Sequence, residues 1–371
     1  MMDCNIFQTN LPTTKIPLTE KISYLLHAVE QSSNAIVITD LDGTIEYVNK
    51  KFCQLTGYSK EEVLGRNPRI LKSGELPDFI YQELWQKISS GKNWQGEFHN
   101  IKKNGELFWD FTSISAIKNE HGENIKYLAI KDDINARKKA EENLQKTEQK
   151  LQQDFILAGK IQKSLLPTNI STPFFELISF YQPYRHVSGD TFDFSASKSG
   201  KKLIGYVADV MGHGLGTALQ TSGLRILCHQ ILTERIPLSQ RLKTVNKVSG
   251  SCFTEDSFAA IIAFEFDFIA MTLTYVTAGI NSFLKLNNKK KSFIKAPGPF
   301  IGMLEDIDYE EHKIPISSND VFCFMTDGIT DLMESCNFSI KDLPDLYLQV
   351  ETLVNSNPCK DDATAILIKV K

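Results

Sequence analysis

No stretch of this sequence is apolar for long enough to suggest a membrane-spanning helix. The longest apolar region, residues 258–276, is interrupted by Glu265 and Asp267 and is typical of two β-strands instead. The first residues lack the basic flank and the apolar core of a secretion signal. We therefore expect no leader peptide and no membrane partner.

The sequence also lacks clustered cysteines and an excess of basic charge. Its seven cysteines are scattered, with no Cys-x-x-Cys pair. This usage favours reduced thiols and a cytoplasmic location over a disulfide framework. The chain has 41 Lys and Arg against 45 Asp and Glu, a formal net charge of −4, so no global basic field attracts nucleic acid. We expect no nucleic-acid partner.

The length of 371 residues allows two or three domains. Composition and the positions of proline, glycine and turn residues predict a flexible tail over residues 1–19, a first domain over residues 20–136, a helical linker over residues 137–166 and a second domain over residues 167–371.

The first domain has the pattern of an antiparallel sheet. Asp42-Gly43 separates two β-branched runs, residues 35–40 and 45–49, which is a strong hairpin signal. Three more strands are predicted between residues 94 and 132, and helices over residues 22–31 and 50–64.

This region resembles a PAS sensor domain over about residues 20–136. The resemblance rests on collinear segments: Asn34-Ala-Ile-Val-Ile-Thr-Asp40, Tyr47-Val-Asn49, Leu55-Thr-Gly-Tyr58, Leu64-Gly-Arg-Asn67, Trp94-Gly-Glu97 and Ile130-Lys-Asp-Asp-Ile134. It implies a five-stranded antiparallel sheet with helices over one face, around a pocket.

Residues 65–71 resemble flavin-binding PAS domains in particular. Light-sensing members carry a Cys after Asn67, whereas this chain has Pro68, which excludes photoadduct chemistry there. Asn100 and Asp110 fall where polar side chains contact flavin in related domains. A redox-type flavin, a small ligand, and purely structural signalling all remain open.

The linker has a heptad pattern. Leu144, Leu151, Ala158 and Leu165 recur every seven residues, and we place Phe155 and Gln162 at the alternate seam positions. A short parallel coiled coil that forms a homodimer is favoured, and the alternative is a single helix docked on its own domain. Pro167 ends the helix.

The second domain combines apolar strands with short acidic segments. Strands are predicted near residues 203–207, 259–266, 271–276, 321–325 and 365–370, and a helix over residues 216–232, so we expect an α+β sandwich. Four aspartates, Asp190, Asp209, Asp327 and Asp361, sit at strand ends or beside glycines. Carboxylates on rigid turns are typical ligands of Mg²⁺ or Mn²⁺ and indicate a two-metal hydrolase.

This domain resembles the SpoIIE-type branch of the metal-dependent protein phosphatases, the protein phosphatase 2C class. The resemblance rests on Ile161-Gln-Lys-Ser-Leu-Leu-Pro167, the four aspartate segments, Thr277-Ala-Gly279 and Gly298-Pro-Phe-Ile-Gly302. It implies an α/β-β/α sandwich of the metal-dependent phosphatase type.

The resemblance also implies roles for single residues. Asp209 bridges two Mn²⁺ or Mg²⁺ ions and the main-chain carbonyl of Val210 also binds metal, while Asp190, Asp327 and Asp361 complete the ligand set.

For other residues near the four aspartates, a role at the metal site competes with an ordinary structural role. His213 could donate a proton to the leaving oxygen, or be a turn histidine bonded to main chain. Asp193 could support the metal ligands or bind metal at the periphery, or cap a turn. Asp362 is expected to orient its neighbours rather than bind metal.

The chain departs from the family pattern around these ligands. Ser188 replaces a glycine before Asp190, Met211 replaces a small residue, and Thr277 and Ile280 stand where Asn and His are usual.

The prediction is a signal-regulated phosphoserine/phosphothreonine protein phosphatase, whose substrate by resemblance is an anti-sigma-factor antagonist of the STAS type. The alternative is a non-catalytic scaffold that binds phosphoproteins through a degenerate phosphatase domain.

Overall fold

The computed structural model describes residues 17–371, except residue 255 and residues 288–289, 336–341 and 358–360. The chain divides into two compact units, Met1–Glu148 and Gln149–Lys371. The boundary falls inside helix α5 (Asn135–Leu165) and therefore inside the predicted linker. Most of the predicted tail lies outside the described residues.

The first unit contains the predicted five-stranded antiparallel sheet, in the order β2-β1-β5-β4-β3. Its elements are α1 (Leu18–Glu30), β1 (Ala35–Thr39), β2 (Ile45–Val48), α2 (Lys50–Thr56), α3 (Lys60–Val63), the 3-10 helix η1 (Pro68–Leu71), α4 (Asp78–Ser89), β3 (Trp94–Ile101), β4 (Leu107–Lys118) and β5 (Asn124–Asp133).

Local chemistry explains where these elements begin and end. Asn49, fully buried, accepts a hydrogen bond from Phe52 N at the start of α2. Gly57 ends α2 in the left-handed region at φ 75°, so the single helix predicted over residues 50–64 is two helices. Helix α4 was not predicted.

The second unit has two antiparallel sheets, ordered β14-β11-β10-β9-β8 and β13-β12-β15-β16-β7-β6. Its strands are β6 (Ile170–Ser171), β7 (Phe175–Gln182), β8 (Asp190–Ala196), β9 (Lys202–Val210), β10 (Ala259–Asp267), β11 (Thr272–Ala278), β12 (Ser282–Asn287), β13 (Lys290–Lys295), β14 (Glu311–Pro315), β15 (Val321–Met325) and β16 (Ala363–Val370). Its helices after α5 are α6 (Leu215–Ile231), α7 (Leu238–Ser249), α8 (Asp327–Ser335) and α9 (Leu343–Ser356).

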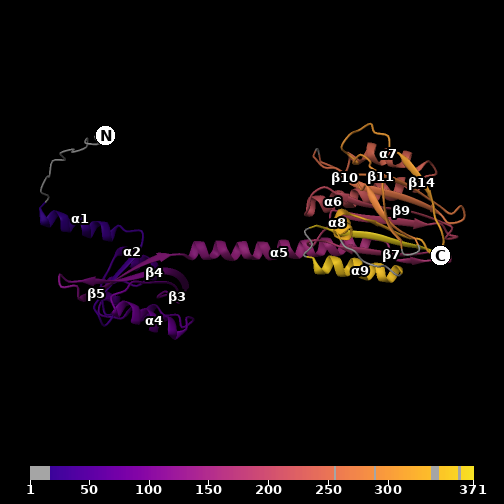
Figure 1. Ribbon diagram of the computed structural model, residues 1–371. Helices are drawn as coiled ribbons and strands as arrows, with labels where there is room; N and C mark the ends of the chain where they lie inside the picture. Colours follow the sequence, from indigo (N-terminus) through magenta and orange to yellow (C-terminus); the bar gives the residue numbers. More distant parts are fainter. Residues whose placement is uncertain (1–16, 255, 288–289, 336–341, 358–360) are drawn as a thin grey trace, which may run out of the picture. The chain divides into compact units, whose positions relative to one another are not determined.

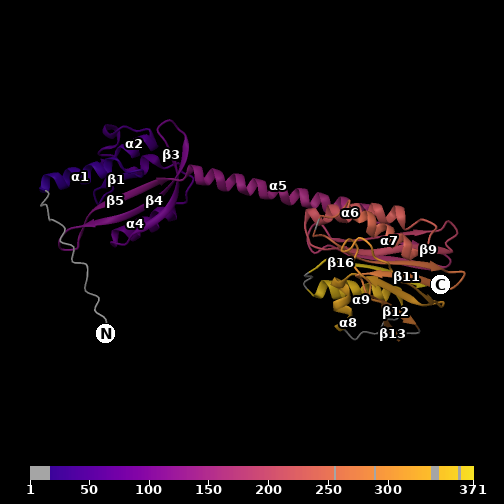
Figure 2. The ribbon, with the colours of Figure 1, turned by 90° about the horizontal axis from the view of Figure 1, so that it is seen from above.

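Three apolar layers hold this unit together. Phenylalanines fill the space between the sheets, where the rings of Phe264 and Phe324 stack with centroids 4.2 Å apart. A second core lies under α6 and α7, and a third under α8 and α9. Figures 1 and 2 show the two helix pairs on opposite sides of the sheets, which confirms the predicted α/β-β/α sandwich.

The predicted linker forms helix α5, but two of the residues that we assigned to its dimer seam lie elsewhere. Gln162 is buried and bonded to Ser188, and Phe155 lines a pocket of the second unit. The placement of Phe155 and Gln162 on a free coiled-coil seam is therefore wrong, and residues 155–162 dock on their own domain. Leu144, Leu151 and Leu165 remain exposed.

Candidate active site and a second pocket

Strand pairing brings Asp190 and Asp209 together. Asp190 opens β8, Asp209 lies near the end of β9, and the register places the two directly opposite each other. Directly opposed residues point to the same face of a sheet. The next opposed pair on the same face is Phe192 and Val207, two residues away on each strand. Both belong to the core between the sheets, so the two carboxylates lie on that inner face.

The other sheet contributes the remaining acids. Asp327 follows β15 at the start of α8, and Asp361 precedes β16, the neighbour of β15. Together with Asp209 and Asp362 they line one pocket of about 540 Å³. Asp190 lies deeper, 1% exposed, and accepts a hydrogen bond of 2.9 Å from the hydroxyl of Thr326.

Burial and the repulsion of neighbouring carboxylates disfavour the charged forms of Asp190, Asp209 and Asp327. Burial, then the charges of Asp327, Asp361 and Asp362, raise the pKa of Asp209 to about 7. Burial and the charge of Asp209 raise the pKa of Asp190 well above its usual range. Burial and the charge of Asp361 raise the pKa of Asp327. Bound cations would relieve this repulsion, and such perturbed groups cluster at functional sites.

The geometry fits a hydrated divalent ion better than a closed protein cage. Among the residues that the structure describes, no three His, Cys, Asp or Glu side chains converge on a point that could hold a metal ion. Mg²⁺ usually keeps several waters and takes one or two carboxylates together with substrate phosphate. The donor set of acidic oxygens suits that mode. A Cβ at Gly189 would lie 2.8 Å from the carbonyl oxygen of Val210, so only glycine fits beside that predicted ligand.

The structure separates Asp193 from the other acids. Three residues after Asp190, it lies on the opposite face of β8, opposite Tyr206 of the core under α6. Its carboxylate is 2.8 Å from His229 Nδ1 and 3.4 Å from the Arg225 guanidinium, both on α6. Asp193 thus anchors α6 and does not reach the pocket.

Asp362 and His213 both lie at the pocket. The Asp362 carboxylate accepts backbone hydrogen bonds from Tyr184 N and Gly189 N, each 2.7 Å long. These bonds hold the backbone at Tyr184 and Gly189, and the orienting role of Asp362 beside the metal ligands stays a prediction. His213 is exposed and lines the pocket next to Gly214, the N-cap of α6. The free N–H groups of this helix end favour a bound anion.

Sequence reasoning missed a basic group in this acidic pocket. Arg185 lines it with Tyr184 and His186, and its guanidinium lies 5.7 Å from the centre of the Tyr184 ring. Within the described part of the chain Arg185 forms no ion pair, although four carboxylates share the pocket. Its position just before the Ser188-Gly-Asp motif was the available signal.

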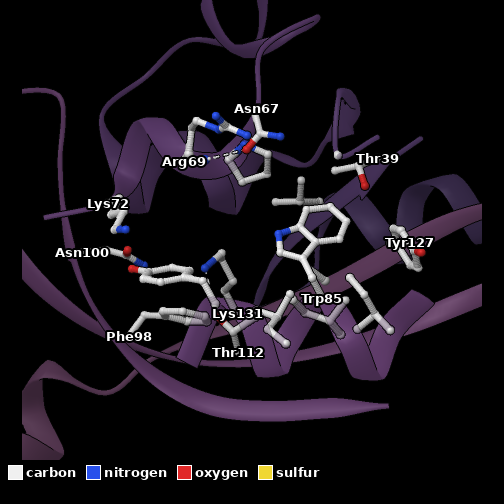
Figure 3. A pocket seen from close by; sticks show the side chains of 18 residues that line it. Thr39, Asn67, Arg69, Lys72, Trp85, Phe98, Asn100, Thr112, Tyr127 and Lys131 are labelled. Carbon is white, nitrogen blue, oxygen red and sulfur yellow. Dashed lines mark hydrogen bonds between the residues drawn. The ribbon is translucent and has the colours of Figure 1, made fainter. Parts of the chain in front are cut away.

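The first unit holds a second pocket, of about 350 Å³, between its sheet and α4. Asn100 Nδ2 donates to Asp110 at 2.6 Å, and Lys131 Nζ lies 3.1 Å from the same buried carboxylate. Figure 3 shows Asn100 and Lys131 toward one end and Trp85 and Tyr127 toward the other. Asn100 lines the pocket, while Asp110 lies behind it.

Asn67 stands at the edge of the same pocket. Its side chain accepts a hydrogen bond from Arg69 N, and Pro68 and Arg69 also line the cavity. No cysteine is among the described residues that line it.

Comparison with known proteins assigns both units. Residues 33–136 match the model of the PAS domain family, and residues 199–371 match that of Stage II sporulation protein E (SpoIIE). The chain carries a PAS domain followed by a SpoIIE-type domain. The family predictions made from the sequence are thus confirmed.

Three curated relatives match different parts of the chain. The nitrogen fixation regulatory protein of Klebsiella oxytoca is 40% identical over 116 residues, 31% of this chain and 23% of its own length. Phosphoserine phosphatase RsbP of Bacillus subtilis is 26% identical over 231 residues, 58% of this chain and 57% of its own. Phosphoserine phosphatase RsbU of the same organism is 24% identical over 213 residues, 57% and 62% respectively. The chain therefore spans less than two thirds of each relative. None of the described helices is both long and apolar enough to cross a bilayer.

Proposed function

We propose that this chain is a Mn²⁺- or Mg²⁺-dependent phosphatase that hydrolyses phosphoserine or phosphothreonine on a partner protein, under the control of its PAS domain. The observation that carries the proposal is the pocket lined by Asp209, Asp327 and Asp361, in which burial and neighbouring carboxylate charges raise the pKa of Asp209 and of Asp327. The names of two relatives, both phosphoserine phosphatases, agree with it.

Each acid has a part in the proposed chemistry. The carboxylates of Asp190, Asp209, Asp327 and Asp361 and the Val210 carbonyl would hold the two ions. When bound, the two ions would supply charge neutralisation and an activated water for in-line attack on phosphorus. Asp362 holds the backbone next to Asp190, and His213 is exposed at the pocket where it could protonate the leaving oxygen.

The test is Mn²⁺-dependent phosphate release from a phosphoserine protein by wild type and Asp209→Asn. We expect the variant to lose activity by at least about a hundredfold, since charge stabilisation at the reacting centre usually contributes more to catalysis than any other single effect. The matched control is Asp308→Asn. Asp308 is exposed, pairs with Lys243 and lies outside the pocket, so this variant should keep full activity. Equal rates for Asp209→Asn and wild type would exclude the metal mechanism.

A non-catalytic scaffold is the second candidate, because no three acidic or imidazole side chains converge on one point among the described residues. In that case the protein would bind a phosphoprotein without turnover. Tight binding of the phosphorylated partner, with no phosphate release at saturating Mn²⁺, would favour the scaffold.

The partner and the oligomeric state are further proposals. A STAS-type antagonist is the proposed substrate, by analogy with the family. A homodimer through α5 is supported by the exposed Leu144, Leu151, Leu157, Ile161 and Leu165. Sedimentation that gives only monomer at tens of micromolar would refute the dimer. A cytoplasmic location is proposed from the scattered cysteines alone.

A flavin in the PAS pocket is proposed from its size, its aromatic Trp85 and the polar Asn100 at one end. Pro68 leaves only non-adduct chemistry at that position. A flavin absorbance spectrum in the purified protein would support the flavin, and its absence after reconstitution with excess flavin would refute it.

A further inference from the structure

A strap of six residues, 184–189, borders the candidate active site. Tyr184, Arg185 and His186 are exposed and line the pocket, whereas Val187 and Ser188 are buried. The strap leads directly into Asp190, whose backbone N–H donates to the Ser188 hydroxyl at 3.0 Å. The position of the strap therefore determines where the Arg185 side chain lies at the pocket and where the buried Asp190 carboxylate lies.

Helix α5 contacts this strap through Gln162. The structure describes every residue of α5, and Gln162 is the only one that is buried. Gln162 Nε2 donates to the Ser188 carbonyl at 2.8 Å, and Gln162 Oε1 accepts from Ser188 N at 3.0 Å. The amide thus satisfies both backbone groups of one residue.

The contact is close enough to exclude side chains. A Cβ at Gly159, three residues earlier on α5, would lie 1.7 Å from the carbonyl oxygen of His186. One turn earlier again, Phe155 lines the pocket itself. A glycine at this position lets the helix backbone lie directly on the strap.

Two further elements hold the strap, the segment that precedes β16 and helix α6. The Asp362 carboxylate accepts hydrogen bonds from Tyr184 N and Gly189 N, and Thr221 of α6 donates to the Gly189 carbonyl at 3.0 Å. Of these anchors, only Gln162 lies on the helix that begins at the end of the PAS domain.

We propose that Gln162 is a positioning residue through which helix α5 fixes the strap, and with it Arg185 and Asp190, in the geometry needed for metal and phosphate binding. A rotation or axial shift of α5 would break the two Gln162 bonds and release the strap. This gives the PAS domain a direct route to the site. The consequence for turnover rests on the proposed function, whereas the hold on the strap does not.

The test uses the full-length chain with Gln162→Ala, Gln162→Glu and the matched control Gln153→Ala, an exposed glutamine of the same helix. Gln162→Glu keeps the size of the side chain and its acceptor for Ser188 N, and it guards against a folding failure of the alanine variant. Three quantities are measured: hydrogen exchange of a peptide that covers residues 184–190, Mn²⁺ affinity, and Mn²⁺-dependent hydrolysis of p-nitrophenyl phosphate.

We expect Gln162→Ala to speed exchange of the strap and to lower Mn²⁺ affinity and turnover by at least about tenfold, because two hydrogen bonds are lost. Gln162→Glu should lie between Gln162→Ala and wild type, and Gln153→Ala should match wild type. Unchanged strap exchange, or faster exchange with wild-type turnover and Mn²⁺ affinity, would overturn the proposal. If wild type itself neither binds Mn²⁺ nor turns over, the proposed function fails, and strap exchange alone then decides whether Gln162 holds the strap.

Discussion

The acidic pocket should make the metal-free protein less stable as the pH rises, and Asp209→Asn should remove much of that loss. The pKa of Asp209 rises from an ordinary 3.8 to about 7 in the folded chain. Between these values the folded state binds more protons than the unfolded state, so stability falls as the pH rises, and the loss is complete above about pH 7.

The magnitude follows from the same pKa. A difference of about three pH units corresponds to about 4 kcal/mol for an isolated group. Because the neighbouring carboxylates share the repulsion, we expect Asp209→Asn to gain roughly 2–4 kcal/mol at pH 7.5 in EDTA and little at pH 4.5. For a domain of this size that is a rise in Tm of roughly 5–15 °C.

The assay must report on the second unit. All three tryptophans, Trp85, Trp94 and Trp109, lie in the first unit, so tryptophan fluorescence would follow the wrong transition. Calorimetry in EDTA at pH 4.5 and 7.5 avoids this. Excess Mn²⁺ should reverse the order, since a bound ligand stabilises wild type by mass action.

The isosteric comparison is Asp193→Asn on the same sheet. It should destabilise at pH 7.5, because Asp193 is paired with Arg225 and His229 rather than with like charges. If Asp209→Asn fails to stabilise the metal-free protein at pH 7.5, or stabilises it equally at pH 4.5, the electrostatic reasoning is wrong.

Two further predictions concern single contacts. Gly328→Ala should cost roughly 1–3 kcal/mol and weaken Mn²⁺ binding, because a Cβ there would lie 2.1 Å from the Asp362 carbonyl oxygen; an unchanged Tm and Mn²⁺ affinity would contradict it. Lys131→Met should destabilise the first unit by roughly 3–5 kcal/mol, because it leaves buried Asp110 without its cation; urea unfolding followed by tryptophan fluorescence measures this, and a loss below about 1 kcal/mol would show that the pair contributes little.

The sequence predicted strands more reliably than contacts. Apolar runs such as residues 321–325 and 259–266 coincide closely with β15 and β10, because burial on both faces leaves a continuous apolar run. Helix α4 was missed, although its Leu84 and Ile88 recur at helical spacing and are buried. Phe155 and Gln162 were wrongly assigned to the seam of α5, because a heptad pattern shows only that a face is apolar and does not identify what covers it.

The candidate site shows the same limit. Asp190 and Asp209 meet through a strand register that sequence periodicity does not encode. A place for Asp193 beside the other acids could have been excluded from the strand pleat alone, because Asp190 and Asp193 are three residues apart and therefore point to opposite faces of the sheet. Arg185 lies in an irregular loop, where no periodic pattern marks a functional side chain.

The departures from the family pattern bear on the choice between an active enzyme and a scaffold. Thr277 and Ile280 do not line the pocket; Thr277 is buried beside Gly298, and Ile280 packs in the core between the sheets. Asn281, next to Ile280, accepts a hydrogen bond from Gly298 N and so holds the loop that carries Phe300 to the pocket.

Ser188 adds a bond that glycine could not make, from its hydroxyl to Asp190 N. Of the four departures, only Met211 borders the pocket, where its flexible side chain leaves the acids in contact with the cavity. The substitutions therefore alter the support around the site and leave its acids in place, which favours an active enzyme over a scaffold.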